Sequence, residues 1–180
     1  MPPPRIRHLG ATLVVAIAVA ACTPTLAGAA TNGLGARAVL ERQIATRVNA
    51  VRGWYGLRPL RFSRGLTVAA RRHSREMTVQ GYFEHDSRNG TPFWKRIERS
   101  YPARRFARWE VGENIAWSPL GATAVDVVRQ WMGSPGHRAN LLSATWREFG
   151  LGAFRVPRAG GTYGGRPVTI VTLDLGIRTR

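Results

Sequence analysis

The chain has 180 residues and carries 27 lysine and arginine residues against 10 aspartate and glutamate residues, which gives a formal net charge of +17. Its single cysteine, Cys22, excludes a fold held together by internal disulfides. The sequence contains no internal repeat, low-complexity tract or coiled-coil heptads, so repeat and fibrous architectures are excluded as well.

The strongly basic balance favours anionic partners, such as acidic wall polymers, the head groups of a membrane surface or nucleic acid. Of the 27 cationic residues, 26 are arginine and only Lys95 is lysine. A GC-rich gene explains that excess as readily as selection for a ligand, so a merely solvated basic surface stays open beside a polyanion-binding one. Residues 99–109 interleave arginine with aromatic residues but match no nucleic-acid motif. We therefore expect a covering loop there and no specific nucleic acid partner.

The first part of the chain has the pattern of an export signal. Arg5 and Arg7 precede an apolar run from Ala11 to Ala21, and small residues follow. The run is too short to span a bilayer permanently. We therefore expect residues 1–30 to be a signal peptide, residues 31–36 a short linker, and the remainder, residues 37–180, one extracellular or cell-envelope domain.

Cys22 ends the apolar run in the tetrapeptide Val19-Ala20-Ala21-Cys22. This segment resembles the lipobox of bacterial lipoproteins, which would place a lipid anchor on Cys22. Ordinary cleavage near Ala27-Gly28-Ala29 satisfies the small-residue rule equally well and would discard the thiol. Lipoprotein and freely secreted protein therefore both stay open.

Apolar residues recur at helical spacing over residues 37–52, which predicts an amphipathic first helix. Ser63 is a candidate N-cap for a second helix that ends near Gln80, before Gly81. His73 lies on the apolar face of that helix, so we expect a hydrogen-bonded structural histidine. Three further helical segments are expected: Phe93 to Arg99, a helix opened by Ser118-Pro119 that carries Trp131 and Met132, and a short turn from Arg138 to Leu142.

The pattern changes after Trp146, where residues 149–156 and 168–175 are both typical of strands. The segment between them is rich in glycine, so we expect a long C-terminal hairpin. Helices on either side of such strands predict an α+β fold, a three-layer α-β-α sandwich around a small antiparallel sheet.

Three motifs follow one another in a fixed order. They are Phe83-Glu84-His85, then Gly112-Glu113-Asn114-Ile115-Ala116, then Trp131-Met-Gly-Ser-Pro-Gly-His137-Arg-Ala-Asn140. Together with His73-Ser74 and Met77, they resemble the CAP superfamily of cysteine-rich secretory proteins, insect venom antigens and plant pathogenesis-related proteins, and its bacterial extracellular branch in particular. The resemblance runs from about Val39 to the C-terminus and implies the CAP fold, which is the sandwich expected above.

We expect Gly112 to Ala116 to be a loop, and the resemblance implies that His85, Glu113 and His137 share one cleft. The spacing alone does not show this, because 28 residues separate the first two and 24 the last two. Two neutral imidazoles and one carboxylate are competent ligands for zinc or another divalent cation. Ser134 stands where the family often has a second acidic residue, which predicts weak metal binding. A turn-capping role for Ser134 is expected, and Ser134 and Asn114 are candidate ligand contacts.

The leading functional hypothesis is therefore a non-enzymatic CAP module that binds a small lipid-like or wall-derived ligand, with or without a divalent ion. A second hypothesis is a metal-assisted hydrolase of peptide or wall polymer, with Glu113 as general base. The third is a basic surface protein that binds anionic polymers through its arginines.

Overall fold

The computed structural model describes residues 26–119, 121 and 123–180, and it describes side chains from residue 37 onward. Most of the expected signal peptide, including Cys22, lies outside the described residues. The first helix begins at Leu26, so residues 31–36 are helical and the linker expected there is wrong. Residues 26–45 contain no proline, and their alanine and leucine residues favour a helix, although Gly33 and Gly35 do not.

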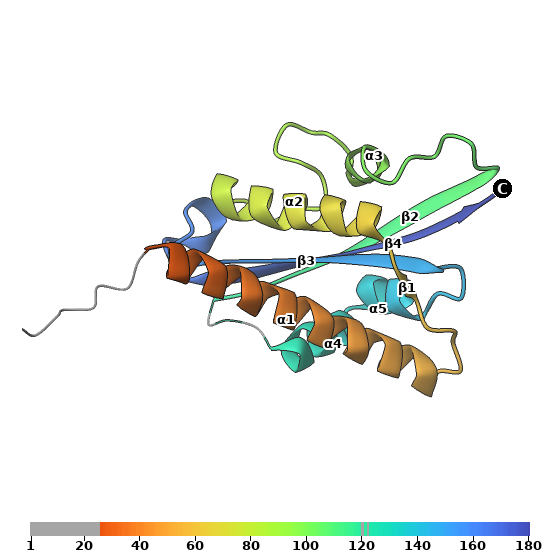
Figure 1. The fold of residues 1–180 in the computed structure, drawn as a ribbon, viewed down its shortest axis with the longest axis horizontal. Helices are drawn as coiled ribbons and strands as arrows, with labels where there is room; N and C mark the ends of the chain where they lie inside the picture. The colour runs from red at the N-terminus through yellow and green to blue at the C-terminus, as the bar shows by residue number, and fades with distance from the viewer. Residues whose placement is uncertain (1–25, 120, 122) are drawn as a thin grey trace, which may run out of the picture.

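The structure is a four-stranded sheet between two layers of helices (Figure 1). The strand order is β1-β3-β4-β2, with β1 parallel to β3 and the other pairs antiparallel. Helices α2 and α3 cover one face, and α1, α4 and α5 cover the other. In chain order the elements are α1 (Leu26–Trp54), β1 (Arg61–Phe62), α2 (Arg64–Gln80), α3 (Phe93–Glu98), β2 (Arg108–Ser118), α4 (Ala124–Gly133), α5 (Pro135–Leu142), β3 (Glu148–Val156), a 3-10 turn (Gly161–Tyr163) and β4 (Val168–Thr179). The expected three-layer α-β-α sandwich is confirmed.

The first two helices form where the apolar periodicity predicts them. On α1, Ile44 and Val48 are buried in the core between this helix, α4 and the sheet. Helix α2 follows Ser63 directly and ends before Gly81, whose φ of 69° is the left-handed conformation that glycine adopts at helix ends. None of the described helices is long and apolar enough to cross a lipid bilayer.

The segment Gly112 to Ala116 was expected to be a loop, and that expectation is wrong. It lies in the middle of β2, which pairs with β4 over its whole length. The local pattern conceals the strand because a glutamate and an asparagine occupy adjacent positions, one on each face of the sheet. Strand β1 was not anticipated either, since two residues carry no periodicity.

The helix boundaries after β2 also differ from those expected. Ser118 is the last residue of β2, and α4 begins only at Ala124. Thr123 and Asp126 form a capping box, which satisfies backbone N–H groups at the start of α4 and fixes its first residue. Helix α5 begins earlier than expected, at Pro135, because proline is well tolerated in a first helical turn.

Strand β2 lies at an edge of the sheet, and side chains of α4 and α5 bond to its backbone. The Trp131 indole donates to the Ile115 carbonyl oxygen at 3.0 Å, and the Asn140 amide donates to the Glu113 carbonyl oxygen at 3.1 Å. These bonds satisfy acceptors that an edge strand leaves without a neighbour. The two ends of the Trp131–Asn140 motif therefore hold the α4–α5 corner against β2.

The expected C-terminal hairpin is confirmed, with β3 and β4 paired from Glu148↔Gly176 to Val156↔Val168. Gly150 and Gly152 of β3 lie directly beneath α2. A Cβ atom at Gly152 would collide with the backbone of Ala70 and Arg71. Glycine is therefore required here for the close approach of helix and sheet.

We predict that Gly152→Ala lowers the free energy of unfolding by more than about 3 kcal/mol, because neither backbone can yield without separating α2 from the sheet. The matched control is Gly133→Ala at the end of α4, where an added Cβ meets nothing within 4 Å. That variant should be neutral or up to about 1 kcal/mol more stable. Urea unfolding followed by circular dichroism measures both, and equal effects at the two sites would contradict the packing argument.

Candidate functional site

The structure brings His85, Glu113 and His137 together at the β2 edge of the sheet. His85 lies in the loop between α2 and α3, Glu113 in β2, and His137 in the first turn of α5. His85 Nδ1 lies 2.9 Å from Glu113 Oε1, and the centroids of the two imidazole rings are 6.0 Å apart. Elements from both helical layers thus meet around the edge strand.

Glu113 is a buried carboxylate whose two oxygens are both engaged. Its side chain is 1% exposed, and Arg96 Nη2 of α3 donates to Oε2 at 2.6 Å. Burial alone would raise the pKa of Glu113, but the hydrogen bond with His85 and the positive charge of Arg96 outweigh burial, so the pKa is lowered. Glu113 therefore stays ionised and holds a fixed negative charge beneath His85.

Glu113 and Arg96 both hold His85 in place. Because the ionised Glu113 only accepts hydrogen bonds, His85 Nδ1 donates to it. Arg96 Nη2 also donates to the His85 carbonyl oxygen at 3.0 Å. The His85 side chain is 47% exposed, and its ring lies 6.4 Å from that of Phe93. The imidazole is thus anchored on one side and accessible on the other.

The backbone of His137 is held by a buried asparagine. Asn114 Nδ2 donates to the His137 carbonyl oxygen at 3.0 Å, and Asn140 donates to Asn114 Oδ1 at 3.0 Å. Burial, followed by the nearby His85, lowers the pKa of His137, so this ring is neutral at pH 7. Asn114 is completely buried. It positions His137 from the opposite face of β2.

Asp174 of β4 lies directly opposite Glu113 in the strand pair. It is completely buried, and neither of its carboxyl oxygens has a hydrogen-bond partner within the part of the chain that the structure describes. Burial, followed by the negative charge of Glu113, raises the pKa of Asp174 well above its usual range. Both causes favour the protonated, neutral form of Asp174 beside the ionised Glu113.

His73 is the buried structural histidine that the helical pattern predicts. Its side chain is fully buried, and Nε2 lies 3.0 Å from the Glu84 carbonyl oxygen. Burial lowers the pKa of His73, so the ring is neutral. Its Nε2 lies 3.9 Å from Glu113 Oε1. His73 thus fixes the chain just before His85.

Ser134 ends α4 and immediately precedes α5, but its side chain makes no capping hydrogen bond at either helix. The expected capping bond is therefore wrong, although the position of Ser134 at the turn is right. No observation in the described structure assigns Ser134 a ligand.

The donor set tests whether a divalent cation fits here. Among the described residues, no group of three or more His, Cys, Asp or Glu side chains is arranged to hold a metal ion. Both oxygens of Glu113 are already bound, one by Arg96 and one by His85. Glu113 therefore orients the His85 ring through its Nδ1, as carboxylates do for metal-binding histidines. The donors left for a cation are the two imidazoles, which fit weak binding with solvent completing the coordination and do not fit a closed structural zinc site.

Two important residues escaped the sequence analysis, Arg96 and Asp174. Asp174 does leave a trace, because it is the single acid inside the apolar run of β4. A charged residue in a strand buried on both faces requires a partner or a proton. Arg96 leaves none, since an arginine in a short helix is ordinary.

Comparison with known proteins gives consistent matches. Residues 45–173 match the model of the cysteine-rich secretory protein family, CAP. Two relatives come from Bacillus subtilis (strain 168): the uncharacterized protein YkwD, 36% identical over 115 residues, and the uncharacterized membrane protein YlbC, 30% identical over 115 residues. The matches cover 62% and 64% of this chain but only 41% and 32% of the relatives. The chain thus spans less than half the length of either.

Among solved structures, an extracellular protein containing an SCP domain from Bacillus anthracis str. Ames aligns with a TM-score of 0.61 and 25% identity, over 80% of this chain and 41% of that one. The cysteine-rich secretory protein SAV1118 from Staphylococcus aureus aligns with a TM-score of 0.57 and 17% identity, over 80% and 39%. The second match shows a shared fold alone.

We predict that Asp174→Asn stabilises the protein at pH 7. A group whose pKa is raised by folding lowers stability as pH rises above its unfolded pKa, and asparagine removes that loss. The free energy of unfolding should rise by about 1 kcal/mol or more, since one pKa unit is worth about 1.4 kcal/mol. The difference from wild type should vanish below about pH 4. Chemical unfolding at several pH values measures it.

The control for this prediction is Asp126→Asn in the capping box of α4. Hydrogen bonds from Thr123 lower the pKa of Asp126, so its contribution is present at pH 7 and is lost as pH falls. That variant should be less stable at pH 7, which is the opposite sign. A wild-type protein more stable than Asp174→Asn at pH 7 would contradict the neutral state of Asp174.

Proposed function

The chain belongs to the CAP family of cysteine-rich secretory proteins, and from this we propose that it is an exported binding module without enzymatic activity. Its binding site is the His85–His137 pair at the β2 edge. The site takes a divalent cation weakly, together with a small lipid-like or wall-derived ligand. Export is supported by the N-terminal signal pattern and by the Bacillus anthracis structural relative, which is described as extracellular.

The observation that carries this proposal is the state of Glu113. A general base must accept a proton near the working pH and reach the reacting group. Glu113 is buried, is bound by Arg96 on one oxygen and by His85 on the other, and has a lowered pKa. It is therefore a poor base and a good support for the His85 ring, which favours binding over hydrolysis.

The surroundings of the two rings support a small ligand with both polar and apolar parts. The half-exposed His85 ring lies near both His137 and Phe93, with centroid distances of 6.0 and 6.4 Å. Imidazole nitrogens bind a cation or a polar group, and the phenyl ring packs against an apolar one.

We predict that zinc binding measured by isothermal titration at pH 7.5 weakens at least about tenfold in His85→Ala and in His137→Ala, because each removes one of two imidazole donors. The matched control is Glu110→Gln, which removes an exposed carboxylate from the same strand without touching the pair. Isotherms identical to wild type in both histidine variants would contradict the cation site.

We predict that the wild-type protein does not hydrolyse peptide or wall-polymer fragments above the rate of a buffer blank, as product analysis by chromatography would show. Turnover that a chelator abolishes and Glu113→Gln eliminates would establish the hydrolase instead. Turnover that persists in Glu113→Gln would exclude Glu113 as its base.

A further inference from the structure

A groove between α1 and the start of α4 lies apart from the histidine pair. It has a volume of about 660 Å³, which is within the range of small-molecule sites. One wall is a stripe of α1 that runs from Gln43 to Trp54, and the other wall is the first turn of α4 with Thr123 before it. The groove shares no residue with the histidine pair, so the two sites are separate.

The stripe of α1 in this groove combines polar side chains with one tryptophan. Gln43, Thr46, Arg47 and Trp54 recur at helical spacing, and all four are exposed. They lie outside the buried core of the protein, so packing does not explain why an indole belongs to this stripe. The stripe is therefore a candidate surface for a ligand.

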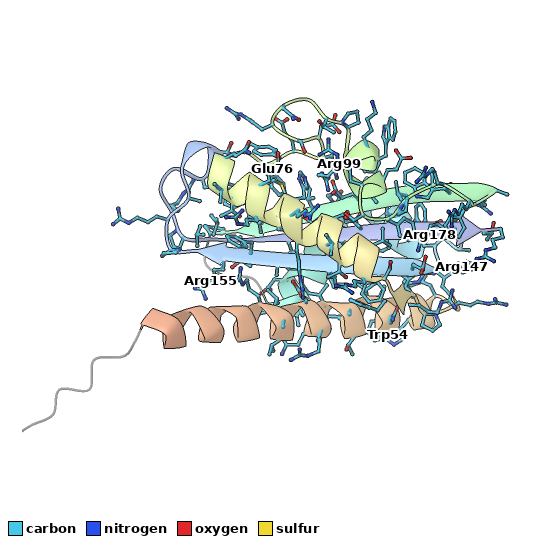
Figure 2. All side chains as sticks on the ribbon, turned by 45° about the horizontal axis from the view of Figure 1, so that its top comes forward. Trp54, Glu76, Arg99, Arg147, Arg155 and Arg178 are labelled. Carbon is cyan, nitrogen blue, oxygen red and sulfur yellow. The ribbon has the colours of Figure 1, made fainter. Side chains whose placement is uncertain are left out.

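Trp54 has the highest exposed fraction, 79%, of the large hydrophobic residues that the structure describes. Figure 2 shows it near the C-terminal end of α1. Tryptophan is highly buried on average, and its flat ring offers a large apolar surface beside one N–H donor. The indole N–H groups of Trp109 and Trp131 donate to backbone carbonyl oxygens, whereas that of Trp54 has no partner within the described chain. Trp54 thus provides the groove with a free aromatic surface.

Arg47 gives the groove its charge. It is the one charged side chain among the described residues that line this hollow. Its guanidinium makes neither an ion pair nor a hydrogen bond with any part of the chain that the structure describes. Guanidinium groups bind carboxylate oxygens through paired N–H donors. Arg47 precedes Trp54 by two helical turns, about 10 Å along the axis, so one small ligand can contact both side chains.

Neutral hydrogen-bonding groups complete the lining. The Gln43 amide offers two donors and one acceptor, and none of them is used within the described residues. The Thr46 hydroxyl donates to the Arg42 carbonyl oxygen at 3.1 Å, which leaves its own oxygen as an acceptor. An uncharged amide and a hydroxyl match the hydroxyl groups of a ligand. A purely apolar acid would leave both without a partner.

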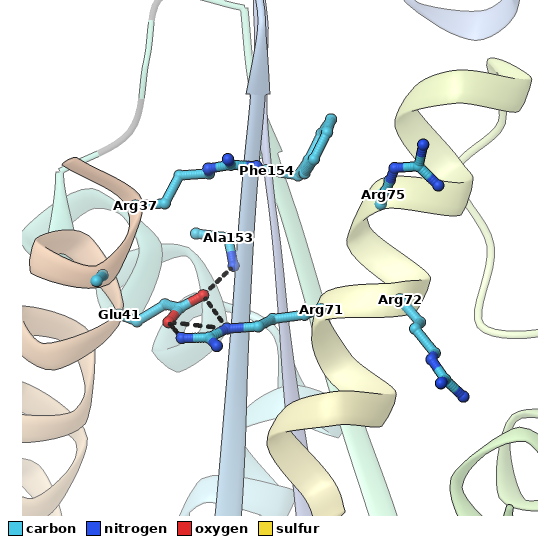
Figure 3. A pocket seen from close by; sticks show the side chains of 8 residues that line it. Arg37, Glu41, Arg71, Arg72, Arg75, Ala153 and Phe154 are labelled. Carbon is cyan, nitrogen blue, oxygen red and sulfur yellow. Dashed lines mark hydrogen bonds and ion pairs between the residues drawn. The ribbon is translucent and has the colours of Figure 1, made fainter. Parts of the chain in front are cut away.

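Both walls of the groove are fixed within the fold. On the other flank of α1, Glu41 accepts hydrogen bonds from Arg71 Nε and from the Ala153 backbone N–H, each at 3.0 Å (Figure 3). This bridge joins α1 to α2 and β3. The capping box of Thr123 and Asp126 fixes the first turn of α4. A preformed groove costs a ligand little ordering of the protein, which favours binding.

We propose that the groove between α1 and α4 binds a sugar that carries a carboxylate, of the hexuronate class. The apolar face of the sugar ring stacks on Trp54, the carboxylate pairs with Arg47, and ring hydroxyls form hydrogen bonds with Gln43 and Thr46. The positive field of the protein attracts such an anion. A neutral sugar leaves the guanidinium without a partner, so the acid and the sugar ring are both required.

The test follows the indole N–H signal of Trp54 in nitrogen–proton correlation NMR spectra, where its absence from Trp54→Ala identifies it. Methyl glucuronoside, methyl glucoside and cyclohexanecarboxylate are titrated separately at pH 7. Methyl glucuronoside should shift the signal saturably, and the other two should bind at least about tenfold more weakly. If methyl glucuronoside causes no shift, or binds no more tightly than either of the others, the proposal is wrong.

Two pairs of variants place the ligand in the groove. Arg47→Gln should reduce the affinity for methyl glucuronoside to that for methyl glucoside, because only the ionic contact is lost. Arg104→Gln is its matched control, since it removes the same charge from an exposed residue of the α3–β2 loop and should leave both affinities unchanged. Equal losses in the two variants would assign binding to the long-range field and overturn the site.

Saturation transfer from protein protons to the ring protons of methyl glucuronoside provides the second comparison. Trp54→Ala should abolish the transfer, whereas Trp94→Ala, at an exposed tryptophan of α3, should retain it. Transfer that persists in Trp54→Ala would contradict stacking on this indole. His137→Ala should behave like wild type, which separates the groove from the histidine pair. Arg47 and Trp54 are exposed, so their variants should fold normally, as thermal unfolding would verify.

Discussion

The buried negative charge of Glu113 is the constraint around which this fold is arranged. A carboxylate removed from water costs several kcal/mol unless it is paired and hydrogen-bonded. Arg96 and His85 supply that pairing from α3 and from the loop before it. The two segments are therefore held over the sheet by the need to satisfy one charge, and the accessible imidazole of His85 is placed by the same bonds. Burial and the negative charge of Glu113 raise the pKa of Asp174, directly opposite Glu113, and so favour its protonated form.

On the other side of β2, neutral side chains form hydrogen bonds that hold α4 and α5 against the strand. An edge strand exposes backbone carbonyl oxygens, and here Trp131 and Asn140 bond to two of them. Asn114 extends the same arrangement to the backbone of His137. The long motif from Trp131 to Asn140 thus serves mainly to close the edge of the sheet. Its histidine reaches the ring of His85 because the corner between α4 and α5 is fixed against the strand.

The sequence allowed some of this to be predicted, and the reasons differ from element to element. Helices α1 and α2 and the β3–β4 hairpin carry strong local periodicity and clear boundary residues such as Ser63 and Gly81. Strand β2 does not, because polar residues that serve the site interrupt its apolar pattern. The three site residues were linked only through family resemblance. No local pattern signals Arg96. Asp174, as the single acid in the apolar run of β4, signals that it needs a partner or a proton but does not identify Glu113 as its neighbour.

Local ion pairs modify the strongly basic electrostatic field of the protein at both edges of the sheet. With a formal charge of +17, the long-range field repels cations and attracts anions. At the β2 edge the buried charge of Glu113 is neutralised by Arg96, so only two imidazoles act on a cation against that field. Weak cation binding follows from charge as well as from ligand number. At the β3 edge Glu41 pairs with Arg71, so the charge of that arginine is compensated locally. Because salt screens interactions beyond about 10 Å at 0.1 M, local pairing, more than total charge, sets the electrostatic environment at each edge.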